Sequence, residues 1–217
     1  MNRNTPSQPR IGVLALQGDF AKHIHMLGEI GVHAVEVRKV EQLFEIDGLI
    51  IPGGESTTIV KLLMRFEFVD QLRSRVESGM ALWGTCAGMI VIARELADSY
   101  PTPLNLLDIG VSRNYFGRQV DSFEAEIDIE GIDGEAMRAV FIRAPVVSDV
   151  GDGVVKIASL DDGQAVAVKK GRVLASSFHP ELTTDTRMHS LFVELAREAQ
   201  IDTLNPTRNA EEISNTA

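Results

Sequence analysis

The sequence predicts an α/β protein with a doubly wound, mostly parallel sheet flanked by helices. In its first half, short apolar runs typical of buried parallel strands alternate with segments of helical character. This alternation is the pattern of doubly wound folds, which bind their ligands at the carboxyl ends of the strands. Two glycine-containing turns, at residues 52–56 and 84–88, follow predicted strands directly and contain candidate active-site residues.

Four strands are predicted in the first half of the chain, over residues 11–16, 33–40, 48–51 and 80–83. Helices are predicted between them, over residues 20–30, 57–68 and 70–78. The first helix should end at Gly31, because glycine commonly lies just beyond the end of a helix. The fourth strand should lead through a sharp turn into another apolar segment, which we expect to begin a helix.

The middle of the chain has a different pattern. Residues 123–129 alternate apolar and acidic side chains, as in a half-exposed strand, and residues 140–145 and 165–168 predict two further strands. A final helix over 186–199 places one apolar face against the core. We expect a single domain over residues 10–200, a disordered N-terminal segment at 1–9 and a flexible tail at 201–217.

Composition narrows the class of protein. The formal net charge of −10 argues against a nucleic-acid binder, whose domains are usually basic. No apolar run approaches the roughly 18 residues that span a membrane, and no charged-then-apolar leader opens the chain. A single cysteine permits no internal disulfide, which suits a reducing compartment. We therefore expect a cytoplasmic protein without nucleic-acid or membrane partners.

That cysteine, Cys86, lies in the segment Gly84-Thr85-Cys86-Ala87-Gly88. The spacing is the cysteine counterpart of a nucleophile elbow, in which flanking glycines permit the tight turn that exposes a nucleophile. A thiolate at the start of a helix is also stabilised by free N–H groups. The alternative is a buried cysteine that packs as a small hydrophobe. A base elsewhere in the chain would favour the catalytic interpretation.

His179 is a candidate for this base, and it follows the apolar stretch at residues 172–177. Glu181 lies two residues further on, with Pro180 between them. In an extended segment, residues i and i+2 point to the same side, so both side chains can face one site. A cysteine nucleophile needs an imidazole to take its proton and benefits from a carboxylate that fixes the imidazole tautomer. A surface turn is the alternative. The combination favours a Cys-His-Glu triad.

The segment Pro52-Gly53-Gly54-Glu55-Ser56 follows the predicted strand at 48–51. Acyl transfer through cysteine needs N–H donors for the tetrahedral oxyanion, and glycines let backbone approach a substrate closely. The N–H groups of Gly53 or Gly54 and of Ala87 are candidates for this oxyanion hole. An ordinary β–α turn is the alternative. A phosphate-binding loop is disfavoured, because the Gly-Lys-Ser/Thr ending is absent.

Together these segments resemble the class I, or triad, glutamine amidotransferases, whose fold is a flavodoxin-like three-layer sandwich. The resemblance narrows to the glutaminase subunits of pyridoxal 5′-phosphate synthase and covers roughly residues 10–197. Its most specific motifs are Gly-Glu-Ser-Thr-Thr and Arg-Asn-x-Phe-Gly-Arg-Gln. The matching segments are 16–18, 23–25, 52–58, 84–88, 113–124, 141–145 and 177–183.

The resemblance implies that Cys86 is the nucleophile, His179 the general base and acid, and Glu181 the orienting carboxylate. It also implies a set of residues that hold L-glutamine, of which the arginines suit its α-carboxylate. These residues are Gly54, Glu55, Ser56, Arg113, Ile142 and Arg143. No metal and no cofactor are expected.

In the resembled family, ammonia released from glutamine passes to a separate synthase subunit. That subunit is a (β/α)8 barrel and builds pyridoxal 5′-phosphate from a pentose phosphate and a triose phosphate. The resemblance implies a large hetero-oligomer in which docking of the synthase activates the glutaminase. The alternatives are a glutaminase of another amidotransferase, a cysteine hydrolase on the same fold, and a non-enzymatic binding module.

Two histidines, His23 and His25, lie in the predicted first helix and point to different faces of it, which makes them poor joint metal ligands. We expect a structural or partner-facing role for them. The sequence assigns no role to His33 or His189.

Overall fold

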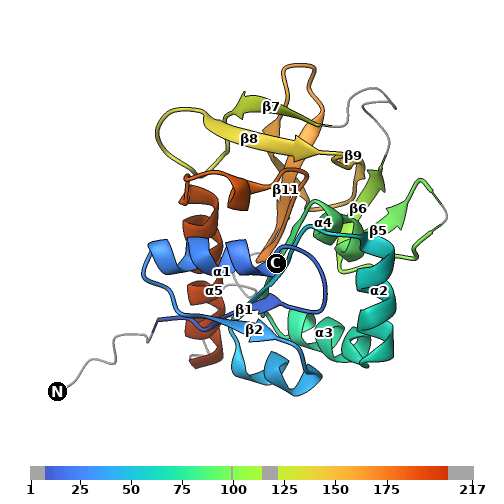
Figure 1. Cartoon of the computed structure of the whole chain (residues 1–217), viewed down its shortest axis with the longest axis vertical. Coiled ribbons are helices and arrows are strands. Elements are labelled where there is room, and N and C mark those ends of the chain that lie inside the picture. Colours follow the sequence, from blue (N-terminus) through green and yellow to red (C-terminus); the bar gives the residue numbers. More distant parts are fainter. Residues whose placement is uncertain (1–7, 99, 114–121, 205–217) are drawn as a thin grey trace, which may run out of the picture.

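The computed structural model describes residues 8–98, 100–113 and 122–204 (Figure 1). Its main sheet has seven strands in the order β10-β11-β12-β4-β3-β1-β2. From β12 to β2 every pair is parallel, whereas β10 and β11 continue the β12 edge antiparallel. The bounds are β1 (Ile11–Leu14), β2 (Ala34–Val37), β3 (Gly48–Ile51), β4 (Ala81–Thr85), β10 (Val155–Ser159), β11 (Ala165–Lys170) and β12 (Val173–Ser176).

The order of the parallel strands confirms the predicted fold class. Read from β2, the order β2-β1-β3-β4-β12 is that of flavodoxin-like sheets. The central strands β3 and β4 are buried along their whole length. This burial explains why their sequences are continuously apolar rather than alternating.

Helices cover both faces of this sheet (Figure 1). On one face, Leu27 and Phe192 join Ile50 and Trp83 in a buried cluster, and on the other face Leu63 packs with the neighbouring strand residues. Adjacent residues of one strand thus enter two different cores. The first face carries α1 (Phe20–Glu29) and α5 (Arg187–Leu204), and the second carries α2 (Ser56–Arg65), α3 (Phe68–Glu77) and α4 (Ala87–Ile92).

The helix boundaries follow local backbone signals. Gly31 has φ of 74° just beyond α1, as predicted for a terminator. The predicted helix at 57–68 ends earlier, because Glu67 takes the left-handed φ of 59° and the chain turns there to bury Phe68 at the start of α3. The predicted strand at 33–40 is also shorter: β2 ends at Val37, and the 3-10 helix η1 (Val40–Glu45) follows.

The second half adds two small sheets beside the main one. The hairpin of β7 (Ser122–Ile127) and β8 (Met137–Ile142) matches the alternating segment predicted at 123–129 and part of the strand predicted at 140–145. The sheet β5-β6-β9 was not predicted. Its strands are β5 (Ala93–Leu96), β6 (Leu107–Ser112) and β9 (Val146–Val150).

The predicted chain ends lie largely outside the described residues, and the described parts differ from the prediction. Gln8 donates a hydrogen bond to Gly31 O at 3.2 Å and Pro9 is buried, so these two residues pack against the domain. At the other end, α5 continues to Leu204, past residue 200 where the tail was expected to begin.

Candidate active site

Cys86 lies at a sharp bend between β4 and α4, with φ of 48° and ψ of −106°. Positive φ is costly for a residue with a β-carbon and is typical of nucleophile elbows. The two flanking glycines permit close packing of the bend. A β-carbon on Gly84 would lie 2.5 Å from the carbonyl carbon of Gly88, and one on Gly88 would overlap Ile51 O. The Cys86 N–H donates to Ser176 O at 2.8 Å, which fixes the bend to β12.

His179 and Glu181 meet just beyond β12. His179 Nδ1 lies 2.7 Å from Glu181 Oε1, and the His179 N–H donates to Val140 O at 2.9 Å. The expectation of an extended segment is wrong, because Pro180 begins the 3-10 helix η2 (Pro180–Leu182). Proline fits the first helical position, where no N–H is needed. The tight turn, rather than strand alternation, brings the imidazole and the carboxylate together.

The charges at this position favour a protonated imidazole. Burial by itself lowers the pKa of His179, but hydrogen bonds with Cys86 and Glu181 outweigh burial and raise it to about 10. Burial by itself raises the pKa of Glu181, but the hydrogen bond from His179 and the positive charge on that imidazole outweigh burial and lower it. The arrangement is therefore suited to an imidazolium between a carboxylate and a sulfur nucleophile.

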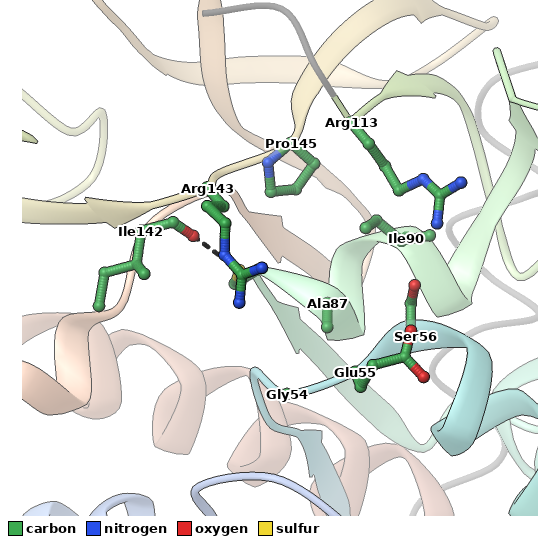
Figure 2. A pocket seen from close by; sticks show the side chains of 10 residues that line it. Gly54, Glu55, Ser56, Ala87, Ile90, Arg113, Ile142, Arg143 and Pro145 are labelled. Carbon is green, nitrogen blue, oxygen red and sulfur yellow. Dashed lines mark hydrogen bonds between the residues drawn. The ribbon is translucent and has the colours of Figure 1, made fainter. Parts of the chain in front are cut away.

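A pocket of about 260 Å³ (Figure 2) has Cys86 among the residues that line it. It is small for a ligand site, which suits a substrate the size of an amino acid. All six residues predicted to hold L-glutamine line it. The lining residues are Gly54, Glu55, Ser56, Cys86, Ala87, Ile90, Arg113, Ile142, Arg143 and Pro145.

Two guanidinium groups supply the positive charge of this pocket. In Figure 2, those of Arg113 and Arg143 both lie above the Gly54-Glu55 segment. Arg113 Nε donates to Asp98 Oδ2 at 3.0 Å, and no other described residue accepts a hydrogen bond from this guanidinium. Arg143 has φ of 44°, a second strained residue beside Cys86. The rest of the predicted motif, residues 114–121, lies outside the described residues.

The carboxylate of Glu55 is hydrogen-bonded to the first turn of α2. It caps the helix, accepting from Thr57 N at 3.1 Å and from Thr58 N at 2.7 Å. Burial would raise the pKa of Glu55, but the hydrogen bonds from Thr58 and Thr57 lower it. The Glu55 N–H donates to Gln17 Oε1 at 2.8 Å. Glu55 therefore fixes the start of α2, which carries Ser56 into the pocket.

Two buried histidines lie behind His179 and Glu181: His23, for which the sequence suggests a structural or partner-facing role, and His189, to which it assigns none. His23 is fully buried, which excludes the partner-facing role considered for it, and its Nε2 lies 3.4 Å from Glu181 Oε2. His189 Nε2 lies 3.0 Å from His23 Nδ1. A signal for His23 was present, because it shares a helix face with Met26 and Leu27.

The described residues contain no cluster of three or more histidine, cysteine, aspartate or glutamate side chains placed to hold a metal ion. Within the same part of the chain, no helix combines the length and apolar character needed to cross a membrane.

Comparison with known proteins places this geometry in a family. The model of the SNO glutamine amidotransferase family matches residues 13–198. The chain belongs to this family. In this chain Cys86 lines a pocket together with two arginines, and His179, paired with Glu181, lies next to Cys86.

Relatives within the family are similar over nearly their whole length. The pyridoxal 5′-phosphate synthase subunit PdxT of Dehalococcoides mccartyi strain BAV1 is 54% identical, over 87% of this chain and 97% of that protein. The PdxT subunit of Frankia alni is 51% identical, over 89% of this chain and 98% of that protein. A crystal structure of a glutamine amidotransferase is 50% identical, with a TM-score of 0.82 over 86% of this chain and 98% of that one.

Proposed function

We propose that this chain hydrolyses L-glutamine to L-glutamate and ammonia as the glutaminase subunit of pyridoxal 5′-phosphate synthase, and so supplies ammonia for vitamin B6 synthesis. The observation that carries the proposal is that His179 is hydrogen-bonded to both Cys86 and Glu181, and that Cys86 lines a pocket together with every residue expected to hold glutamine. The identity of more than 50% to PdxT subunits supports the same substrate and the same assembly. The single cysteine, kept reduced, fits the cytoplasm.

In the proposed reaction, the Cys86 sulfur attacks the side-chain amide carbon of glutamine and forms a tetrahedral oxyanion. The oxyanion collapses as the C–N bond breaks, and His179 gives its proton to the leaving nitrogen, which departs as ammonia. A glutamyl thioester remains on Cys86. His179 then takes a proton from water, which attacks the thioester, releases glutamate and regenerates the sulfur nucleophile. Glu181 holds the imidazole in the tautomer that serves both steps.

The oxyanion is assigned to backbone N–H groups of Gly53 or Gly54 and of Ala87. The Gly53 carbonyl accepts from Asp19 N at 3.1 Å, so this contact fixes the orientation of the peptide that joins Gly53 to Gly54. Glycine on both sides of a peptide allows it to rotate at low cost. We infer that docking of the synthase subunit, a (β/α)8 barrel in a large hetero-oligomer, turns this peptide and completes the oxyanion hole.

A glutaminase assay with and without purified synthase tests the function and the activation together. Glutamate release, ammonia-dependent formation of pyridoxal 5′-phosphate and strong stimulation by the synthase are expected. Cys86→Ala should abolish glutamate release while the variant still docks. Turnover that is equal with and without synthase would overturn the activation, and glutamate release by Cys86→Ala would overturn the catalytic assignment.

A further inference from the structure

A buried polar cluster lies behind Glu181, on the side away from the substrate pocket. Its centre is His23 of α1, whose ring contacts residues from three other elements. His23 Nε2 lies 3.4 Å from Glu181 Oε2 and 3.3 Å from Thr85 Oγ1, and His23 Nδ1 lies 3.0 Å from His189 Nε2. His23, Thr85 and His189 are all fully buried. The proposed mechanism does not use this cluster.

The two oxygens of the Glu181 carboxylate have different surroundings. Oε1 accepts the short hydrogen bond from His179 Nδ1. Oε2 is buried, and within the described part of the chain no well-aligned hydrogen bond reaches it. Among the described side chains, His23 Nε2 faces Oε2 at 3.4 Å, and the carboxylate also interacts with the Glu181 backbone N–H. A buried carboxylate oxygen without a well-placed donor is costly, so the contact with His23 contributes to holding the carboxylate.

The cluster selects one tautomer of His23. If Nε2 were unprotonated, its lone pair would face the carboxylate, which is repulsive. With the proton on Nε2, His23 presents an N–H to Glu181 and Thr85, and its Nδ1 accepts a hydrogen bond from His189 Nε2. His189 Nδ1 then carries no proton, which fits its having no hydrogen-bond partner among the described residues. Burial lowers the pKa of both histidines and keeps them neutral.

The surroundings hold both rings in place. Trp83 of β4 packs edge-on against them, with its ring centroid 5.8 Å from that of His23 and 5.2 Å from that of His189. Trp83 Nε1 donates to Ser176 Oγ at 3.1 Å, which joins β4 to β12. β4 leads to Cys86 and β12 leads to His179. The cluster therefore lies beside the hydrogen bond that joins the two strands preceding the reacting side chains.

We propose that His23 is a positioning residue for the reaction: held by His189, it donates its Nε2–H toward the second oxygen of Glu181 and fixes the carboxylate so that Oε1 stays aimed at His179. Through Thr85, the residue before the nucleophile, it also connects the carboxylate to the elbow. This inference rests on the proposed function, because it assigns a role relative to Glu181 and His179. A merely structural His23 would stabilise the fold and leave turnover unchanged.

Four variants in complex with the synthase separate these possibilities. His23→Gln keeps a donor for Glu181 and an acceptor for His189, whereas His23→Leu keeps neither. His23→Asn keeps the amide on a side chain too short to reach Glu181. His33→Gln is the matched control, because His33 is an exposed histidine to which we assign no role in the site or at the partner. The measurements are kcat and KM for glutamine at a temperature where circular dichroism shows each variant fully folded.

We expect His23→Leu and His23→Asn to lower kcat by about 10- to 100-fold, part of the contribution of a well-placed base, with KM changed by less than about 3-fold. His23→Gln should stay within about 5-fold of the wild-type kcat, and His33→Gln should have the wild-type kcat. Should His23→Leu not fold, the Gln and Asn pair decides. Equal kcat for wild type and His23→Asn, or a loss in His23→Gln as large as in His23→Asn, overturns the inference. If the wild-type complex releases no glutamate, it is the proposed function that fails.

Discussion

Gly53 lies against the imidazole ring of His179. A β-carbon built on Gly53 would come 3.0 Å from His179 Nδ1 and would overlap Cε1, and it would lie 3.5 Å from the β-carbon of Cys86. The loop after β3 therefore forms one wall around the base and the nucleophile. No side chain fits between this loop and the imidazole.

Gly53→Ala should therefore displace His179 from Cys86. We expect kcat to fall by about 100-fold, the typical effect of misplacing a catalytic group by about 1 Å. This fall in kcat is measured by glutaminase kinetics of the variant in complex with the synthase. Gly28→Ala is the control, because a β-carbon there meets nothing within 4 Å. A Gly53→Ala variant with wild-type kcat would show that the contact does not position the base.

Asp98→Asn should weaken binding of glutamine. The Asp98 carboxylate holds Arg113 Nε at 3.0 Å, and a neutral amide holds a guanidinium less firmly. We expect KM to rise by about 3- to 10-fold, equivalent to about 1 kcal/mol, with kcat little changed. Asp70→Asn is the control, since Asp70 forms an exposed ion pair with Arg73, with the charged atoms 3.8 Å apart, and neither residue lines the pocket. An unchanged KM in Asp98→Asn would argue against Arg113 as the carboxylate ligand.

Acid should destabilise the fold through His189. Burial lowers the pKa of His189 to about 3, whereas the unfolded chain binds that proton near pH 6.5. Between these values the unfolded state holds the extra proton, so the free energy of unfolding falls as pH falls, by up to about 1.4 kcal/mol per pH unit for this group. Denaturant titrations from pH 7 to pH 4 measure the slope.

The slope below pH 6.5 should be shallower in His189→Gln, because the group that protonates only on unfolding is gone. His33→Gln is the matched control, since His33 is exposed. Identical slopes for wild type and His189→Gln would contradict a neutral, buried His189.

Cys86→Ala should lower the pKa of His179. Burial lowers this pKa, and the hydrogen bonds with Cys86 and Glu181 outweigh burial to give about 10. Removing the sulfur removes one of the raising contributions and leaves the effect of burial. Titration of the histidine ring resonances by NMR measures the shift, and the exposed His25 serves as an internal control. A His179 titration that is the same in both proteins would rule out the pairing with Cys86.

Sequence patterns correctly predicted those elements of the fold that are determined by residues close together in the sequence. β3 coincides with the predicted strand at 48–51, because its continuous apolar run is buried on both faces. α1 ends where Gly31 takes positive φ. Strands β5 and β6 carry charged side chains and pair only with each other and β9, so no simple periodicity marks them.

In the site, too, residues in short sequence motifs could be predicted, whereas contacts between residues distant in sequence could not. Cys86, His179 and Glu181 could be found because each lies in a short motif next to a strand. His23 and His189 are 166 residues apart in sequence and meet only after α1 and α5 pack on the same face of the sheet. The contact of His189 with His23, and of His23 with Glu181, is a product of tertiary packing, which no pattern within either helix encodes.

The most direct test of the central claim is to trap the acyl-enzyme. The complex is mixed with glutamine, quenched in acid during turnover, digested and examined by mass spectrometry. We predict a glutamyl group in thioester linkage on Cys86, and none in the Cys86→Ala complex. Steady glutamate release with no adduct on Cys86, or with the adduct on another residue, would contradict the proposed mechanism.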